Sequence, residues 1–279
     1  MIAGGARSGT TWLAELVASR TSGRLVFEPF QSEIVSAFKG FHYFQYMRPH
    51  DEDARLLEFS KRVFSGRIRD PWVDKYVEVI RPRTRVVKEI RANLMLRWLH
   101  LQFPSLPLVF IIRHPCAVVA SRLALRWPWE RDLESMLAQD RFRDDFLSAR
   151  AAAIEAARSP VAKHALIWCL THAVPLSQFP PAELWVVFHE DLCLEPERQL
   201  GRVFARIGHP QAGTGAETGR ASMTARSGSG VASVDRWRQE LSREQIDEVR
   251  SVVDAFGLDY LYADGNRPTE AARRLFGVA

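Results

Sequence analysis

Residues 4–13 of the chain have the sequence GGARSGTTWL. Gly4 and Gly9 show the G-x-x-x-x-G spacing of a phosphate-binding loop, and Thr11 stands where that loop carries its Ser or Thr. Thr10 occupies the position of the lysine that reaches the β- and γ-phosphates in nucleotide-hydrolysing loops. The missing lysine raises the question of which anion this loop binds.

The residue types in this segment suit an anion. Small residues between a strand and a helix present backbone N–H groups at the positive end of the helix. The hydroxyls of Ser8, Thr10 and Thr11 add donors, and Arg7 supplies a positive charge. The segment therefore predicts a phosphate-binding loop that opens a helix over Thr10–Arg20.

Strands and helices alternate along the chain. Apolar runs predict strands at 24–30, 85–90, 106–113 and 183–192. Helices are predicted at 92–103, 115–125, 130–157, 160–179, 195–208 and 242–257. This alternation predicts an α/β fold of three α/β/α layers around a central parallel sheet, like that of P-loop NTPases with helical insertions. We expect one domain over 1–279, with a helix-rich cover at about 122–180 and a flexible loop at about 209–234.

The composition favours an anionic ligand over nucleic acid. The net charge of +5 is carried mainly by arginine, which binds phosphate and sulfate through two parallel hydrogen bonds. No basic run with interleaved aromatic residues is present, so we expect no nucleic-acid partner.

Cysteines and apolar runs indicate the compartment. Cys116, Cys169 and Cys193 are odd in number and lack metal-type spacing, which is typical of reduced cysteines in a cytoplasmic protein. The longest apolar run, at 106–112, is too short to span a membrane, and no signal segment is evident. Only Met1–Ala3 precede the loop, so the sequence leaves open whether its start is complete.

The strand ends give little sign of a metal site. Nucleotide hydrolysis needs Mg²⁺, usually held by a carboxylate at the end of a neighbouring buried strand. The strand at 106–113 runs instead into Arg113 and His114. Glu190 and Asp191 do follow a strand, and they fit a helix-capping turn better than a metal site. We expect no metal, and the alternative is a P-loop kinase that uses ATP with Mg²⁺ on these carboxylates.

A second anion site is predicted at 113–121, RHPCAVVAS. Arg113 ends a strand, Pro115 begins a helix, and Ser121 follows Arg113 by eight residues. A long arginine side chain could meet the Ser121 hydroxyl around one shared anion. The sequence therefore predicts two separate phosphate sites.

Both motifs resemble those of one family. ARSGTTWL is similar to the 5′-phosphosulfate loop of sulfotransferases that use PAPS (adenosine 3′-phosphate 5′-phosphosulfate), and FIIRHPCAVVASRL is similar to their 3′-phosphate motif. Weaker similarities are VVKEI, FHEDLCLEPERQLGRVFARIG and RWRQELSREQ. The resemblance is closer to carbohydrate-type and bacterial sulfotransferases than to cytosolic small-molecule ones. It implies in-line transfer of a sulfuryl group from PAPS to an acceptor hydroxyl, with release of PAP and without a metal.

The resemblance also implies ligand-binding residues. The 5′-phosphosulfate would be held by Arg7, Ser8, Gly9, Thr10 and Thr11. Trp12 would stack on the adenine, with a core role as the alternative. Arg113 and Ser121 would hold the 3′-phosphate. A further loose similarity, to an Arg-Lys-Gly contact with the nucleotide, covers Arg226, Ser227 and Gly228, which fit a solvated linker equally well.

The catalytic groups are predicted from the chemistry of transfer. The sulfonate needs cations, and the acceptor proton needs a base. Lys88, at a strand end, is expected to reach the sulfonate together with Arg7. Cytosolic sulfotransferases carry Lys-Thr-His here with His as the base, whereas this chain has Lys88-Glu89-Ile90.

Glu28 is the predicted base. It resembles a Glu in the "fEP" segment of carbohydrate-type enzymes, and its place at the end of an apolar strand predicts a raised pKa. Glu89 is the second candidate, although strand alternation turns it away from Lys88. His42 and His114 are weaker candidates.

The acceptor is the least predictable part. Aromatic residues that could line its pocket, or equally pack as the core of an insertion, are Phe41, His42, Tyr43, Phe44, Tyr46, Trp127 and Trp129. The acceptor is expected to be a glycan, a lipid or a small natural product. A non-catalytic homologue that binds PAP or PAPS is a further alternative.

Overall fold

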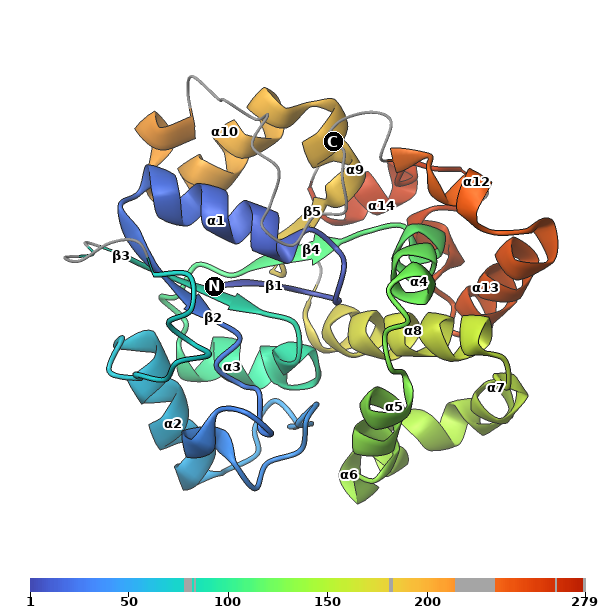
Figure 1. The fold of residues 1–279 in the computed structure, drawn as a ribbon, viewed down its shortest axis with the longest axis horizontal. Coiled ribbons are helices and arrows are strands. Elements are labelled where there is room, and N and C mark those ends of the chain that lie inside the picture. The colour runs from blue at the N-terminus through green and yellow to red at the C-terminus, as the bar shows by residue number, and fades with distance from the viewer. Residues whose placement is uncertain (78–81, 83, 181–182, 214–233, 264, 278–279) are drawn as a thin grey trace.

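A five-stranded parallel sheet lies at the centre of the molecule (Figure 1). The computed structural model describes residues 1–77, 82, 84–180, 183–213, 234–263 and 265–277. The strands are β1 (Ile2–Gly4), β2 (Gly23–Phe27), β3 (Thr84–Glu89), β4 (Val109–Ile112) and β5 (Val186–Phe188). They follow the order β2-β3-β1-β4-β5, and all pairs are parallel. Their carboxyl ends therefore meet at one edge of the sheet, where the loop between β1 and α1 lies.

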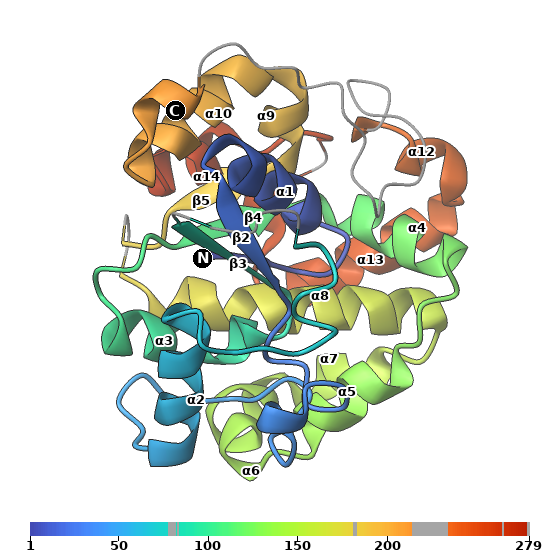
Figure 2. The ribbon, with the colours of Figure 1, turned by 60° about the vertical axis from the view of Figure 1, so that its left-hand side comes forward.

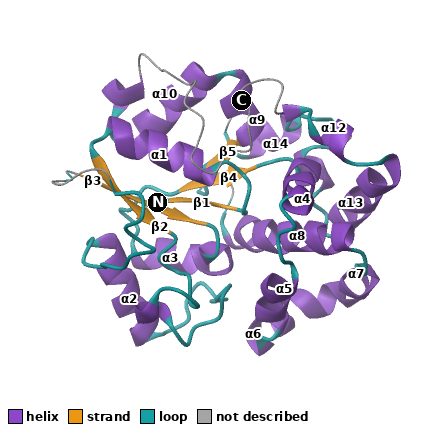
Figure 3. Ribbon diagram, in the orientation of Figure 1, coloured by secondary structure: helices purple, strands orange, loops and turns teal. Residues whose placement is uncertain are grey.

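Helices cover both faces of this sheet (Figure 2). On one side lie α1 (Thr10–Arg20) and α10 (Pro196–Arg206), and on the other lie α3 (Leu96–Gln102) and α8 (Pro160–Gln178). Each face has its own hydrophobic cluster, and every residue of β4 is fully buried between them. The predicted three-layer α/β/α architecture is confirmed (Figure 3).

The remaining helices surround these layers. They are α2 (Ala54–Phe64), α4 (Pro115–Ala124), α5 (Glu130–Leu137), α6 (Asp140–Phe142), α7 (Ala151–Ala156), α9 (His189–Leu194), α12 (Trp237–Glu240), α13 (Arg243–Ala255) and α14 (Glu270–Leu275). Within the described residues, no helix combines the length and apolarity that a membrane crossing requires.

The predicted helix over 130–157 is wrong, because the chain breaks after α5. Gln139 has an extended backbone (φ −97°, ψ 111°), and its side chain is engaged by the neighbouring 44–46 segment. Its amide donates to the Phe44 carbonyl at 2.7 Å and accepts from the Tyr46 N–H at 2.8 Å. These tertiary hydrogen bonds outweigh local helix propensity. Short α, π and 3₁₀ turns follow instead up to the end of α7.

The predicted strand over 183–192 is also too long. Only Val186–Phe188 pair with the sheet, and the chain then turns into α9. Glu190 and Asp191 fall in the first turn of this helix, where negative charge is favoured. The predicted flexible loop at about 209–234 lies largely outside the described residues, and Arg226, Ser227 and Gly228 are among the residues not described.

Candidate active site

The loop between β1 and α1 forms a cradle of backbone groups. Arg7 (φ 70°) and Gly9 (φ 89°) both have left-handed backbone conformations, and Gly9 is the N-cap of α1. A left-handed non-glycine residue costs free energy and is found mainly at functional sites. The hydroxyl of Ser8 is fully buried and has no hydrogen-bond partner among the described residues. An unpaired buried donor in this loop is consistent with a site built for a polar ligand.

We expect Gly9→Ala to destabilise the protein by roughly 2 kcal/mol or more. A Cβ at Gly9 would lie 2.6 Å from Nδ1 of His189, and an Ala at φ 89° is strained in addition. Thermal unfolding measures the loss. The matched control is Gly201→Ala in α10, where a Cβ meets no atom of the described residues within 4 Å. An equal loss in both variants would contradict this account of the loop.

The structure brings the two predicted anion motifs into direct contact. Nε of Arg7 donates to the Ser121 hydroxyl on α4 at 3.0 Å, and Nη1 of Arg113 donates to the Arg7 carbonyl at 2.9 Å. Behind them, the Trp168 indole of α8 donates to the Arg113 carbonyl at 3.0 Å. The loop, the end of β4 and α4 are therefore joined by one continuous series of hydrogen bonds.

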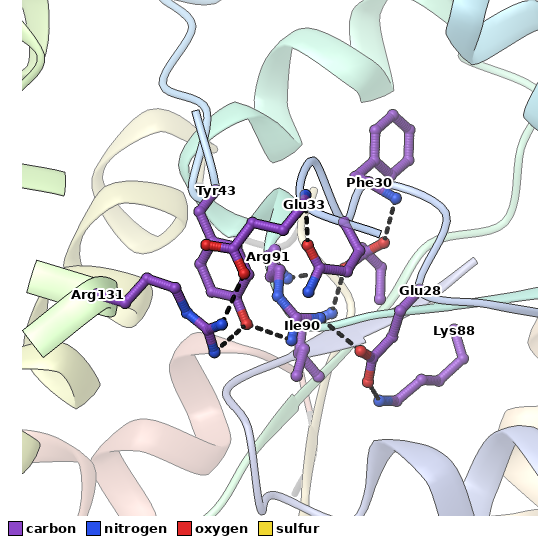
Figure 4. Close-up of polar contacts among 10 residues, drawn as sticks. Glu28, Phe30, Glu33, Tyr43, Lys88, Ile90, Arg91 and Arg131 are labelled. Atoms are coloured by element: carbon purple, nitrogen blue, oxygen red, sulfur yellow. Dashed lines mark hydrogen bonds and ion pairs between the residues drawn. The ribbon is translucent and has the colours of Figure 1, made fainter. Parts of the chain in front are cut away.

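Glu28 lies at the end of β2 between two cations (Figure 4). Its φ of 43° ends the strand, although its N–H still donates to the Lys88 carbonyl at 2.9 Å. One carboxylate oxygen pairs with the Lys88 ammonium and the other with the Arg91 guanidinium. All three side chains are buried. The structure thus brings the predicted base and the predicted sulfonate-binding lysine together.

The expected raised pKa of Glu28 is wrong. Burial does raise its pKa, but the adjacent Lys88 ammonium and Arg91 guanidinium lower it more, to about 2. Arg91, which follows β3, is a residue of this site that the sequence motifs do not identify. The sequence feature that could have identified Arg91 is its position as a second cation, three residues after Lys88 at the end of the same strand.

The network continues from Arg91 toward the surface (Figure 4). The Tyr43 hydroxyl accepts from Nη2 of Arg91 at 2.6 Å and from Nη2 of Arg131 at 3.1 Å. Arg131, on α5, also pairs with Glu33 at 2.6 Å, and both of these side chains are exposed. Of the predicted aromatic cluster, Tyr43 is the residue hydrogen-bonded to the Glu28 network.

Other members of that cluster have different surroundings. Phe44 and Tyr46 are buried in the core beneath the cover, and Phe41 is half-buried there. His42 is exposed. Trp12 is half-buried on α1 and packs against the cluster between α1 and the sheet.

Glu89 faces the opposite side of β3, as strand alternation predicts. Its two oxygens accept three backbone N–H groups, from Phe30 at 3.0 Å, Ile90 at 2.8 Å and Arg91 at 2.9 Å. Burial raises the pKa of this carboxyl. Its role in this structure is to hold together the segments that follow β2 and β3.

We expect Glu89→Gln to lower the free energy of unfolding by about 1–3 kcal/mol, because an amide cannot accept all three N–H groups. Turnover, measured on the folded fraction, should stay within a few-fold of the wild type. Loss of turnover in a variant that stays fully folded would instead identify Glu89 as the base.

His114 and the carboxylates of α9 have structural partners. His114 stacks on Trp237, and burial lowers its pKa to about 3. Glu190 accepts from the His114 N–H at 3.0 Å and from the Tyr262 hydroxyl at 2.7 Å. Asp191 pairs with Arg273 at 2.6 Å. Among the residues that the structure describes, no group of three or more His, Cys, Asp or Glu side chains could hold a metal ion.

Comparison with known proteins defines the class. Residues 1–212 match the sulfotransferase family, and the chain belongs to this family. It is 26% identical over 277 residues to the nodulation protein NoeE of Sinorhizobium fredii (strain NBRC 101917 / NGR234). That match covers 91% of this chain and 62% of NoeE, so the chain spans less than two thirds of its relative. A solved sulfotransferase domain from the curacin biosynthetic pathway is 14% identical, with a TM-score of 0.47 over 92% of this chain and 96% of that one.

Proposed function

We propose that residues 1–279 form one sulfotransferase domain that moves a sulfuryl group from PAPS to an acceptor hydroxyl and releases PAP. The observation that carries this proposal is the contact between the two anion motifs through Arg7, Ser121 and Arg113. PAPS has phosphate groups at its 5′ and 3′ positions, so a ligand of this shape needs two neighbouring anion sites. It has no γ-phosphate, which accounts for Thr10 in place of the P-loop lysine.

In this proposal the loop binds the 5′-phosphosulfate through its backbone N–H groups and hydroxyls. Its residues are Arg7, Ser8, Gly9, Thr10 and Thr11. Arg113 and Ser121 bind the 3′-phosphate, and Trp12 stacks on the adenine. Arg7 donates a hydrogen bond to Ser121, so its side chain lies between the proposed 5′- and 3′-phosphate sites. Arg226, Ser227 and Gly228, which lie outside the described residues, are proposed as a further contact with the nucleotide.

Lys88 and Glu28 are the proposed catalytic residues. Lys88 exchanges its partner Glu28 for the sulfonate, where it stabilises the charge that develops during transfer. Loss of that partner raises the pKa of Glu28 from its low resting value, while Arg91 keeps the carboxylate in place. Glu28 then accepts the acceptor's proton as the new S–O bond forms and the bond to the PAP oxygen breaks. The base thus becomes effective only once Lys88 is engaged.

The acceptor hydroxyl is proposed to belong to a glycan or another small molecule, with lipids included. A P-loop kinase is less well supported, because the carboxylate of Glu190 already accepts hydrogen bonds from the His114 N–H and the Tyr262 hydroxyl. The test is incubation with ³⁵S-labelled PAPS and a panel of glycan, lipid and small-molecule alcohols. Transfer of label to any acceptor, with equimolar PAP, supports the proposal. Transfer of phosphate from ATP under Mg²⁺ would support the kinase instead.

A further inference from the structure

A second lysine lies beside the Glu28–Lys88 pair. The ammonium of Lys75 lies 3.5 Å from the ring centre of Trp72, 4.0 Å from that of Phe27 and 4.9 Å from that of Tyr76. The rings of Trp72 and Tyr76 in turn pack edge-on against Phe27. Three aromatic rings therefore hold this ammonium in one place.

Phe27 connects this lysine to the proposed catalytic groups. The ammonium of Lys88 lies 4.6 Å from the same Phe27 ring centre. Phe27 and Lys88 are also direct partners in the parallel β2–β3 ladder, so their side chains leave the sheet on one face. Leu25 and Val86 leave the sheet on that same face, and both pack in the cluster with α1. Lys75 and Lys88 thus lie together on the side of the sheet covered by the phosphate-loop helix.

The charge around Glu28 is unbalanced. Lys88 and Arg91 share the single carboxylate of Glu28, and Lys75 forms no ion pair with any carboxylate of the described residues. Burial lowers the pKa of Lys75, and the nearby positive charges of Lys88 and Arg91 lower it further, against the opposing effect of Glu28. The cations Lys75, Lys88 and Arg91 thus outnumber the carboxyl groups of Glu28 and Glu89 that act on them, which favours an anionic ligand here.

The ammonium of Lys75 is also available to such a ligand. An aromatic ring attracts a cation through its face and accepts no conventional hydrogen bond from it, so the three N–H donors can serve ligand oxygens. The side chain is exposed overall, so a ligand can approach it. Lys75 therefore combines a fixed position with free donors beside Lys88.

We propose that Lys75 is a second sulfonate-positioning residue, which binds the oxygens of the sulfonate jointly with Lys88. This inference rests on the proposed function. The two ammonium groups would orient the sulfonate for in-line attack and share the negative charge that develops on its oxygens. The Phe27 ring, which contacts both ammonium groups, sets the distance between them.

The test compares PAPS with PAP, which lacks the sulfonate. Lys75→Met keeps the length of the side chain and its packing on the rings but removes the charge. We expect PAPS binding to weaken about 10- to 100-fold and kcat to fall by a similar factor, whereas PAP binding stays within twofold. Lys75→Arg should recover part of both losses. The matched control is Lys61→Met, which removes an exposed lysine of α2 and should change neither ligand's affinity.

Three outcomes would overturn the inference. The first is an equal loss of PAP and PAPS affinity in Lys75→Met, which would assign Lys75 to the nucleotide. The second is unchanged PAPS affinity with a higher KM for the acceptor alone, which would assign it to the acceptor. The third is no change in any constant. Failure of the proposed function looks different, because the wild-type protein would then either bind neither PAP nor PAPS or bind them without transferring label to any acceptor.

Discussion

Glu28→Gln is expected to reduce kcat by roughly 10²- to 10⁴-fold while PAP still binds. The amide cannot accept the acceptor's proton, yet it keeps an oxygen that can accept from Lys88 or Arg91. The experiment measures single-turnover rates with labelled PAPS, together with PAP affinity on the same preparation. Because removing one partner of a buried ion pair costs about 3–5 kcal/mol, folding must be checked by circular dichroism.

Glu33→Gln is the matched control for this variant. Glu33 is a carboxylate of the same network, but it is exposed and pairs with Arg131 at the surface end. An exposed pair contributes about 0–1 kcal/mol, so this variant should fold and turn over like the wild type. A folded Glu28→Gln protein with kcat within tenfold of the wild type would remove Glu28 as the base.

Arg113→Ala is expected to weaken PAP binding about 10- to 100-fold or more, the value of one or two charge-assisted hydrogen bonds to phosphate. Arg113 also donates to the Arg7 carbonyl, so its loss loosens the loop at the same time. AMP, which has no 3′-phosphate, should lose much less affinity. Isothermal titration calorimetry with both nucleotides measures the difference.

Arg62→Ala, at an exposed position of α2, is the control for removing an arginine. It should leave the affinity for PAP unchanged. Equal losses for PAP and AMP in Arg113→Ala would contradict the assignment of Arg113 to the 3′-phosphate. In that case Arg113 would act only through its hydrogen bond to the loop.

Local patterns in the sequence predicted the α/β/α layers and several element boundaries. The predicted phosphate loop opens a helix over Thr10–Arg20 as expected, and Pro115 begins α4 at the first helical position. Alternation along β3 placed Glu89 on the face opposite Lys88. These features depend on residues close in sequence, where spacing and capping chemistry determine the structure.

The candidate site depends on contacts between distant segments, which no local pattern encodes. Arg91 lies 63 residues after Glu28, and its guanidinium acts together with the Lys88 ammonium to lower the pKa of Glu28, against the expected direction. The Arg7–Ser121 hydrogen bond spans 114 residues. Gln139 ended a predicted helix because its amide bonds a segment more than ninety residues away. Each difference arises where a buried polar group takes a partner across the fold.

We propose above all that the chain binds a nucleotide with two separate phosphate groups and does so without a metal. Calorimetric titration of the wild-type protein with PAP and with AMP, each in the presence of EDTA, tests this most directly. We expect PAP to bind at least about tenfold tighter than AMP, the contribution of one further phosphate contact, and EDTA to have no effect. Equal affinities for PAP and AMP, or binding that requires Mg²⁺, would contradict it.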